Sequence, residues 1–117
     1  MSIRAYAKAA ALGTTPRSIE IDAFSRVIRA LRDADRGSPD QILAAVSRNI
    51  DLWTVIEADV SDGGNRLPPE LRMSLARLAA WMRHRSVRAV REPSHLDIII
   101  RVNDEILSGL LGRGQGR

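Results

Sequence analysis

Apolar residues recur every three or four positions along most of this chain, which is the spacing of one face of an α-helix. The longest such stripe consists of Ile42, Val46, Ile50, Trp53, Ile56 and Val60. Two further stripes are Leu71, Leu75, Leu78 and Met82, and then Leu96, Ile99, Ile100, Ile106, Leu107 and Leu110. Residues 98–100 form a β-branched run, but the apolar period around them is helical. The pattern therefore predicts helices rather than strands.

Capping residues, glycines and prolines divide the chain into five predicted helical segments. Ser38 followed by Gln41 forms a capping box, which marks a helix start. Pro93 prevents simple continuation of a helix, and Ser94 with Asp97 predicts a new cap after it. The expected segments lie at about residues 2–12, 15–33, 38–60, 68–91 and 94–110.

The expected fold is all-α. Short connections favour antiparallel neighbours, and 117 residues are enough for one domain. We therefore predict a single compact bundle of four to five mostly antiparallel helices. This domain would occupy residues 1–111, and the glycine-rich residues 112–117 would form a disordered tail.

The composition excludes several protein classes. The chain is 44% apolar but only 3% aromatic, which is typical of cores in which aliphatic side chains pack between helices. The absence of cysteine excludes a disulfide framework and thiolate metal sites. No apolar run approaches the roughly 20 residues that cross a bilayer, and the first residues lack a hydrophobic signal core. We expect a cytoplasmic protein without membrane association.

Charge is unevenly distributed along the chain, whose formal net charge is +4. Residues 33–62 hold seven acidic side chains and two arginines, whereas residues 66–91 hold seven arginines and one glutamate. One interpretation is that these two segments are neighbouring helices whose outer faces attract each other weakly. The other is a bipolar surface whose basic patch binds a partner.

No residue pattern specifies a catalytic or metal site. His84 and His95 have neither a nucleophile nor an orienting carboxylate at a recognisable spacing, so we interpret both as surface histidines. The chain has no pair of histidines at metal-ligand spacing. We expect no enzyme activity, no cofactor, no metal and no small-molecule substrate.

Polar residues beside the apolar stripes are the most informative local feature. Asn49 and Trp53 are four positions apart and share a helix face, where an unpaired amide would cost about 1–3 kcal/mol. We expect Asn49 to tie two helices together, with the loop at Asn65 as a candidate partner. Glu20 lies on the expected buried face of its helix, with Arg17 as its nearest candidate partner.

The segment that precedes the fourth predicted helix is expected to turn tightly. Residues 65–68 would place Leu67 in the core as a hydrophobic staple. Arg72 lies one turn into the following helix. Its side chain could reach back to that loop or to an acidic residue such as Asp59.

Trp81 and the arginines that follow it offer a candidate partner surface. A tryptophan can anchor a partner through its apolar body and polar N–H, although most are core residues. Arg83, Arg85 and Arg88 lie near a helix C-terminus, where cations also complement the helix dipole. No aromatic residues for base stacking are interleaved with them, so a solvated face is favoured over nucleic-acid binding.

Residues spread over nearly the whole chain, from Met1 to about Leu111, resemble the FlaF family of flagellar-biosynthesis regulators. The resemblance depends on the order and spacing of Tyr6, Ala9, Ala10, Pro16, Arg17, Glu20, Phe24, Val27, Ala30, Leu31, Arg48, Asn49, Leu52, Trp53, Asp59, Asn65, Leu67, Pro68, Leu71, Arg72, Asn103, Gly109 and Leu110. The candidate structural motif within it is Glu20, Asn49, Trp53, Asn65, Leu67, Pro68 and Arg72. The residues after Gly112 depart from the pattern, and residues 91–97 align loosely.

The resemblance implies a non-enzymatic cytoplasmic protein that binds flagellin and couples its synthesis to secretion and filament assembly, with or against the regulator FlbT. We expect an apolar groove that holds an amphipathic flagellin helix, as an export chaperone would. The candidate partner-binding residues are Trp81, Met82, Arg85, Arg88, Ile99, Asn103 and Ile106.

Two alternatives to flagellin binding remain. One is a post-transcriptional regulator that binds flagellin messenger RNA through the arginine-rich fourth helix, with affinity that falls steeply with salt. The other is a structural subunit of a larger assembly, which would form a stable oligomer.

Overall fold

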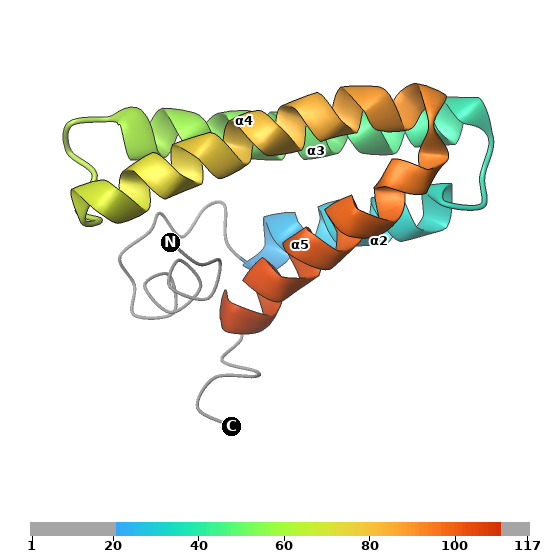
Figure 1. The fold of residues 1–117 in the computed structure, drawn as a ribbon. Helices are drawn as coiled ribbons and strands as arrows, with labels where there is room; N and C mark the ends of the chain where they lie inside the picture. Colours follow the sequence, from blue (N-terminus) through green and yellow to red (C-terminus); the bar gives the residue numbers. More distant parts are fainter. Residues whose placement is uncertain (1–20, 111–117) are drawn as a thin grey trace.

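Four α-helices and one short 3-10 turn make up residues 21–110, the part of the chain that the computed structural model describes (Figure 1). In order they are α2 (Ile21–Ala34), α3 (Pro39–Ser61), α4 (Pro69–Arg91), the turn η2 (Pro93–His95) and α5 (Leu96–Leu110). Several predictions concern residues outside this described part. They are the helix expected at residues 2–12, the start of the one expected at 15–33, Glu20 with Arg17, and the tail expected at 112–117.

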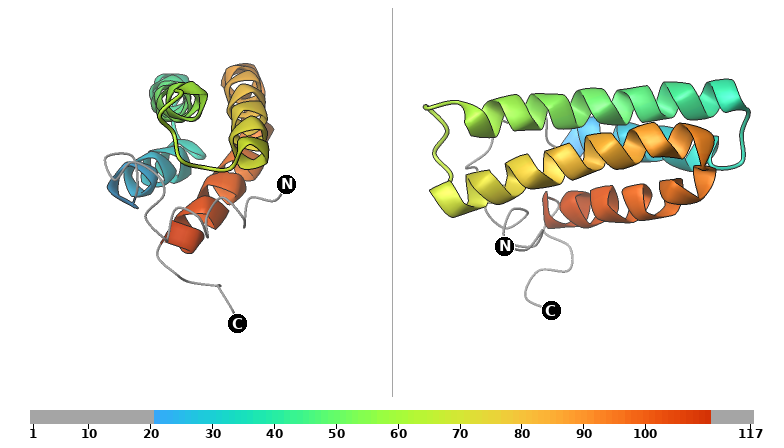
Figure 2. Two further views of the ribbon diagram at one scale, coloured as in Figure 1. Left: turned by 90° about the vertical axis from the view of Figure 1, so that its left-hand side faces the viewer. Right: turned by 45° about the horizontal axis from the view of Figure 1, so that its top comes forward.

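The helices run up and down in turn, so each is antiparallel to the helix before it (Figure 1). Seen end-on, α3 and α4 form one layer, with α2 and α5 beneath them (Figure 2). The most extensive contact joins α3 to α4, and α2 packs against both α3 and α5. Helices α4 and α5 meet mainly near their common end and diverge from it. The predicted all-α bundle of antiparallel helices is confirmed.

The start of α3 is set by the predicted capping box. Gln41 N donates to Ser38 Oγ at 3.2 Å, and Ser38 N donates to Gln41 Oε1 at 2.7 Å. Both N–H groups would otherwise lack a partner at the helix end. A Cβ atom at Gly37 would lie 2.4 Å from Gln41 Oε1, so glycine leaves the space that this reciprocal pair needs.

Side-chain hydrogen bonds hold the loop between α3 and α4. Asn65 Nδ2 donates to Asp59 Oδ2 at 3.0 Å, and Asn65 Oδ1 accepts from Leu67 N at 2.9 Å. Arg72 reaches back from α4 and donates to Val60 O at 2.9 Å and to a loop carbonyl. Val60 lies in the last turn of α3, where no intrahelical donor remains, and the loop carbonyl is that of Asp62, the C-cap residue. Leu67 is buried as expected, and Arg72 binds the loop backbone rather than the Asp59 carboxylate.

Both layers contribute to one core. Phe24 of α2 meets Trp53 of α3 edge to face, with ring centroids 6.1 Å apart, an arrangement that aromatic pairs favour. Both rings are fully buried. The other large apolar side chains that are fully buried are Leu31, Val46, Ile56, Leu75, Met82, Leu96, Ile99 and Ile106.

Two details of the helices differ from the prediction. On α4, Ala79 is fully buried while Leu78 is only partly buried. The expected cap at Ser94 is absent, since Ser94 lies inside η2. This turn, which begins at Pro93, redirects the chain from α4 into α5.

Candidate functional site

A chain of hydrogen bonds between four buried side chains crosses the centre of the bundle. Trp53 Nε1 donates to Asn103 Oδ1 at 2.9 Å, and Asn103 Nδ2 donates to Asn49 Oδ1 at 2.8 Å. Asn49 Nδ2 then donates to Ser86 Oγ at 2.8 Å. All four residues are fully buried and come from α3, α4 and α5. We call this set the polar relay.

A single donor sets the direction of the polar relay. The indole N–H of Trp53 can only donate, so Asn103 must turn its amide oxygen toward it. The amide nitrogen of Asn103 then faces Asn49, which must present its own oxygen. The nitrogen of Asn49 is left to donate to the hydroxyl of Ser86. Because every member depends on its neighbour, the relay specifies how α3, α4 and α5 fit together.

The relay confirms that Asn49 joins helices, but the partner suggested for it was wrong. Asn65 bonds to Asp59 and to the loop backbone, whereas Asn49 bonds to Ser86 and Asn103. The reason is geometric, because Asn49 lies in the middle of α3 and Asn65 lies beyond its end. Ser86 was missed, and its one signal was its position four residues after Met82 on the buried side of α4.

Four of the candidate partner-binding residues lie in the interior. Met82, Ile99, Asn103 and Ile106 have no exposed surface. In this conformation they contact the chain's own core, so a partner could reach them only if the helices separated. The candidates that reach the surface are Trp81, Arg85 and Arg88.

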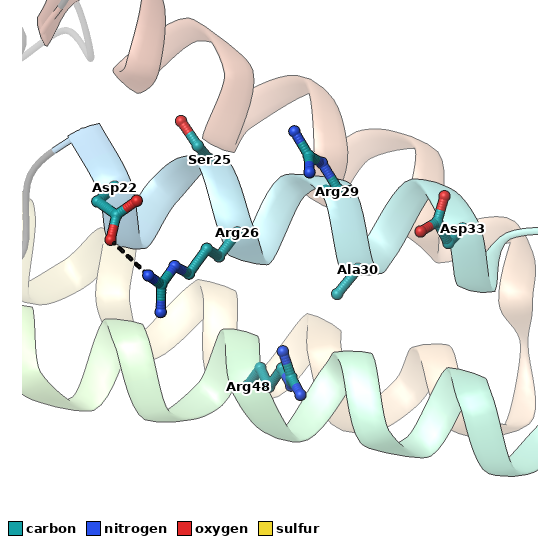
Figure 3. Close-up of a pocket in the computed structure, with 7 residues that line it drawn as sticks. All are labelled: Asp22, Ser25, Arg26, Arg29, Ala30, Asp33 and Arg48. Carbon is teal, nitrogen blue, oxygen red and sulfur yellow. Dashed lines mark ion pairs between the residues drawn. The ribbon is translucent and has the colours of Figure 1, made fainter.

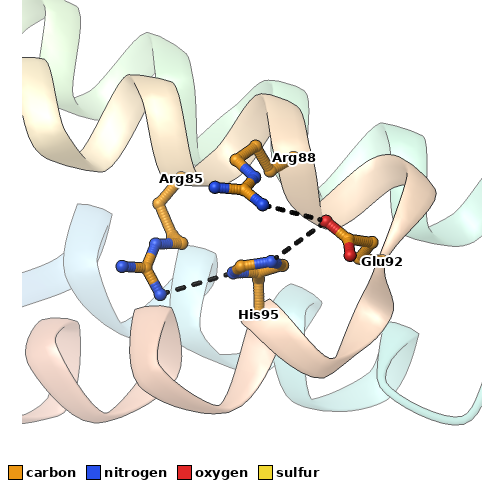
Figure 4. Close-up of polar contacts among 4 residues, drawn as sticks. All are labelled: Arg85, Arg88, Glu92 and His95. Carbon is orange, nitrogen blue, oxygen red and sulfur yellow. Dashed lines mark hydrogen bonds and ion pairs between the residues drawn. The ribbon is translucent and has the colours of Figure 1, made fainter.

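Arg85 and Arg88 lie on α4 near its corner with η2 (Figure 4). Trp81 lies four residues before Arg85 on the same helix. The Arg85 guanidinium carbon lies 4.8 Å from the centre of the Trp81 ring, a cation–π arrangement. Arg85 Nη1 also lies 3.3 Å from His95 Nδ1, and His95 Nε2 lies 3.3 Å from Glu92 Oε1. Arg88 approaches the same Glu92 oxygen at 3.3 Å. The side chains at this corner are thus bound to one another within the chain.

Hydrogen bonds to Glu92 favour its ionised form. The hydrogen bond from Arg88, followed by the one that involves His95, lowers the pKa of the Glu92 carboxyl below its ordinary value. Solvent screens these exposed contacts, so they orient the corner more than they stabilise it. The His95 side chain is 17% exposed, so it is partly buried and less accessible than the surface histidine that we expected. His84 is exposed as expected.

A groove runs along the seam between α2 and α3. One part of it, with a volume of about 460 Å³, is lined by Asp22, Ala23, Arg26, Val27, Arg48, Asp51, Leu52 and Val55. Two adjoining hollows of about 370 and 220 Å³ extend it toward Ala34 and Gln41. Arg48 lines all three hollows and therefore marks the middle of this α2–α3 groove.

Charged side chains flank an apolar floor in the α2–α3 groove. Asp22 and Arg26 of α2 form an ion pair at 3.0 Å, and Arg48 points from α3 toward α2 (Figure 3). Leu52 is nearly buried at the base of the groove, whereas Val55 is 48% exposed. An apolar strip between charges is complementary to an amphipathic helix.

Sequence reasoning did not find this groove. Arg48 contributed only to the family resemblance, and Val55 lies outside the buried stripe of α3. The available signal was the spacing of Arg48, Leu52 and Val55, which places them on one helix face. That signal does not reveal how far α2 stands from α3, and this separation determines whether a groove exists.

Asp59 has a perturbed carboxyl at the end of α3. Partial burial raises the pKa of Asp59, the hydrogen bond from Asn65 opposes this shift, and the nearby charge of Asp62 adds to it. The net shift of the pKa is upward. The Asp59 carboxylate thus accepts a hydrogen bond in the loop although its partial burial disfavours the charged form.

Comparison with known proteins places the chain in a biological context. Residues 2–110 match the family model described as flagellar protein FlaF. No curated protein and no solved structure matches the chain. Within residues 21–110, no helix has both the length and the apolar character required to cross a membrane.

Proposed function

Because the chain belongs to the FlaF family of flagellar proteins, we propose that it binds flagellin and couples flagellin synthesis to secretion and filament assembly. The observation that carries this proposal is the α2–α3 groove. It combines an apolar floor with acidic and basic side chains on both helices. This arrangement suits a helical protein segment better than a small polar molecule.

The dimensions of the groove fit a short helix. The groove follows α2, which has 14 residues and is therefore about 21 Å long. A guest of about four turns could place one apolar stripe on Val27, Leu52 and Val55. Its charged flanks would then meet Asp22 and Arg26 of α2 on one side and Arg48 and Asp51 of α3 on the other, which would set its direction.

Unexported flagellin has amphipathic terminal helices that become buried only in the filament. Holding one of them in the α2–α3 groove would prevent premature polymerisation and keep the chain competent for export. Occupancy of the groove would also report how much flagellin awaits secretion. This is how binding alone could link synthesis to assembly without a chemical reaction.

The messenger-RNA alternative has less support from the contacts of the arginines. Arg83 pairs with Glu57, Arg85 lies over Trp81 and Arg88 approaches Glu92. An RNA phosphate would have to compete with each of these contacts. We therefore favour a protein partner over a nucleic acid.

Titration of the purified protein with flagellin tests the proposal. We expect binding to full-length flagellin at micromolar concentration, and loss of binding when the terminal helix that occupies the groove is deleted. Nuclease treatment should not change the affinity, and added salt should weaken it only moderately. A lack of binding to full-length flagellin, or binding that nuclease abolishes, would contradict the proposal.

A further inference from the structure

We propose that the outer surface of the α3–α4 pair is the contact surface for a second copy of this chain. This hairpin face comprises Leu43, Ser47, Ile50, Thr54 and Glu57 of α3 and Met73, Ala76, Ala80, Arg83, Val87 and Val90 of α4. It belongs to the layer that lies over α2 and α5 (Figure 2). It is separate from the α2–α3 groove, so the proposal does not depend on flagellin binding.

Large apolar side chains are concentrated on the hairpin face. Leu43 is 51% exposed, Met73 58%, Val87 61% and Val90 39%. In the described part of the chain, Val55 in the α2–α3 groove is the one other large apolar side chain exposed to this degree. Scattered surface apolar residues need no explanation, but a set gathered on one face indicates an interaction site.

The spacing of these residues is that of a helix-packing seam. On α4 the hairpin face runs through positions 73, 76, 80, 83, 87 and 90, and on α3 through 43, 47, 50, 54 and 57. Steps that alternate between three and four residues bring side chains into register with another nearly parallel or antiparallel helix. Both helices already use a different stripe for the core. The second stripe therefore points to a partner that is itself helical.

Three polar side chains of the hairpin face, Thr54, Glu57 and Arg83, are paired within the chain. Glu57 forms an ion pair with Arg83. Thr54 Oγ1 donates to Ile50 O at 2.8 Å, which satisfies the hydroxyl locally. A partner that excluded water from this face would thus meet a compensated charge pair rather than an isolated charge, which would be costly to bury.

A second copy of the α3–α4 pair has the length needed to cover the hairpin face. Helices α3 and α4 have 23 residues each, so each is about 35 Å long. With an interaxial distance of about 10 Å and a helix diameter of about 10 Å, the pair is roughly 20 Å wide and presents a surface of roughly 700 Å². Burial of this surface on both copies would remove roughly 1,400 Å² from water, which is the size of stable protein interfaces.

The charges on the hairpin face are also self-complementary. A two-fold axis that passes near Glu57 and Arg83 would place each carboxylate beside the guanidinium of the second copy. The same patch would then serve both copies, as it does in most symmetric dimers. Leu43, Val87 and Val90 would be buried around this central set of charges.

Light scattering and analytical ultracentrifugation of the purified full chain test the proposal. We expect a dimer over a hundredfold range of concentration that starts at low micromolar. Leu43→Asp and Val87→Asp should each shift the protein to monomer, because each places a charge in an apolar contact. Val55→Asp is the matched control, since it introduces the same charge at a valine of similar exposure on α3 but outside the hairpin face.

Charge reversal provides a second test that does not disturb the apolar contacts. Glu57→Arg alone and Arg83→Glu alone should each weaken self-association roughly a hundredfold, because like charges then meet across the interface. An equimolar mixture of the two variants should associate again. A monomeric wild-type protein, a dimer that persists in Leu43→Asp and Val87→Asp, or folded charge variants that fail to associate when mixed would overturn the proposal.

Discussion

Asn49 and Asn103 lie 54 positions apart in the sequence, yet their amide groups are joined by a hydrogen bond of 2.8 Å in the interior of the bundle. Neither residue is exposed. Each uses its other amide atom for a second buried partner, Ser86 and Trp53 respectively. Two asparagines thus connect the long α3–α4 pair to the last helix, and packing of apolar stripes alone would not fix this register.

Truncation of Asn103 should destabilise the protein strongly. Asn103→Ala leaves the Trp53 N–H and the Asn49 carbonyl without partners and opens a small cavity, so we expect a loss of about 3 kcal/mol or more in unfolding free energy. Asp104→Ala is the control, since within residues 21–110 that neighbour pairs with Arg32 at the exposed surface, a contact worth about 0–1 kcal/mol. Urea unfolding measures both. Equal effects of the two substitutions would contradict the structural role of the relay.

Loss of the capping box of α3 should lower the unfolding free energy less than Asn103→Ala does. Ser38→Ala removes the acceptor for Gln41 N and should cost about 0.5–2 kcal/mol. Gly37→Ala should destabilise in the same direction, because its Cβ would displace the Gln41 side chain and break the bond to Ser38 N. In the background of Gln41→Ala, Gly37→Ala should lose most of this effect. An unchanged cost in that background would show that the side chain of Gln41 is not responsible.

Substitutions in the α2–α3 groove should weaken flagellin binding without unfolding the protein. Val55→Asp places a charge on the apolar part of the groove, and Arg48→Glu reverses the charge at its middle. We expect each to lower the affinity about tenfold or more, which corresponds to about 1.4 kcal/mol. Isothermal titration with full-length flagellin measures this change.

Two variants at other surfaces test whether the α2–α3 groove, rather than another surface, binds flagellin. Leu43→Asp changes an equally exposed residue of α3 on the hairpin face and should leave flagellin affinity nearly unchanged. Trp81→Ala should have a small effect as well, because Trp81 stacks on Arg85 at the α4–η2 corner. If Trp81→Ala weakened binding more than Val55→Asp, the surface around Trp81 rather than the groove would be the flagellin site.

Asp59 predicts a pH dependence of stability. Its pKa is higher in the folded protein than the ordinary value of 3.8, so the folded state holds the proton more tightly than the unfolded chain. This contribution to stability is fully present below pH 3.8 and is lost as the pH rises through the raised pKa. Asp59→Asn keeps an oxygen that can accept from Asn65 and removes the charge. We therefore expect this variant to gain stability relative to wild type at neutral pH.

The stability gain from Asp59→Asn should shrink as the pH falls through the raised pKa of Asp59. Urea unfolding at several pH values would detect this change. Asp51→Asn is a suitable comparison, because it removes an exposed carboxylate from the same helix. A gain of equal size in both variants at neutral pH would indicate a general effect of net charge. In that case the burial of Asp59 would not be the cause.

Local features of the fold could be predicted from the sequence because their partners lie close by in the chain. The Ser38 capping box involves residues three positions apart, and the N–H of the buried Leu67 is bound by Asn65 two positions before it. The apolar stripes likewise identified α3, α4 and α5. At Ser94 the prediction failed, since a 3-10 turn at a proline and a capped helix start have similar sequences.

Features that depend on the distance between helices could not be predicted. The partners of Asn49 come from two other helices, and no pattern within α3 identifies them. Met82 and Trp81 are neighbours on α4, yet one is in the core and the other partly exposed. The edge of an apolar stripe is buried only where a neighbouring helix covers it. For the same reason, the sequence did not reveal the groove beside Arg48.

The different surroundings of the two tryptophans give the protein a pair of intrinsic optical probes. The indole of Trp53 is sealed in the interior with its N–H bound to Asn103, so its fluorescence should stay blue-shifted while the helices remain together. Trp81 lies partly in solvent beneath a guanidinium, and a collisional quencher should reach it first. With one tryptophan replaced by phenylalanine at a time, emission spectra could follow loss of the interior and changes at the α4–η2 corner separately, without any attached dye.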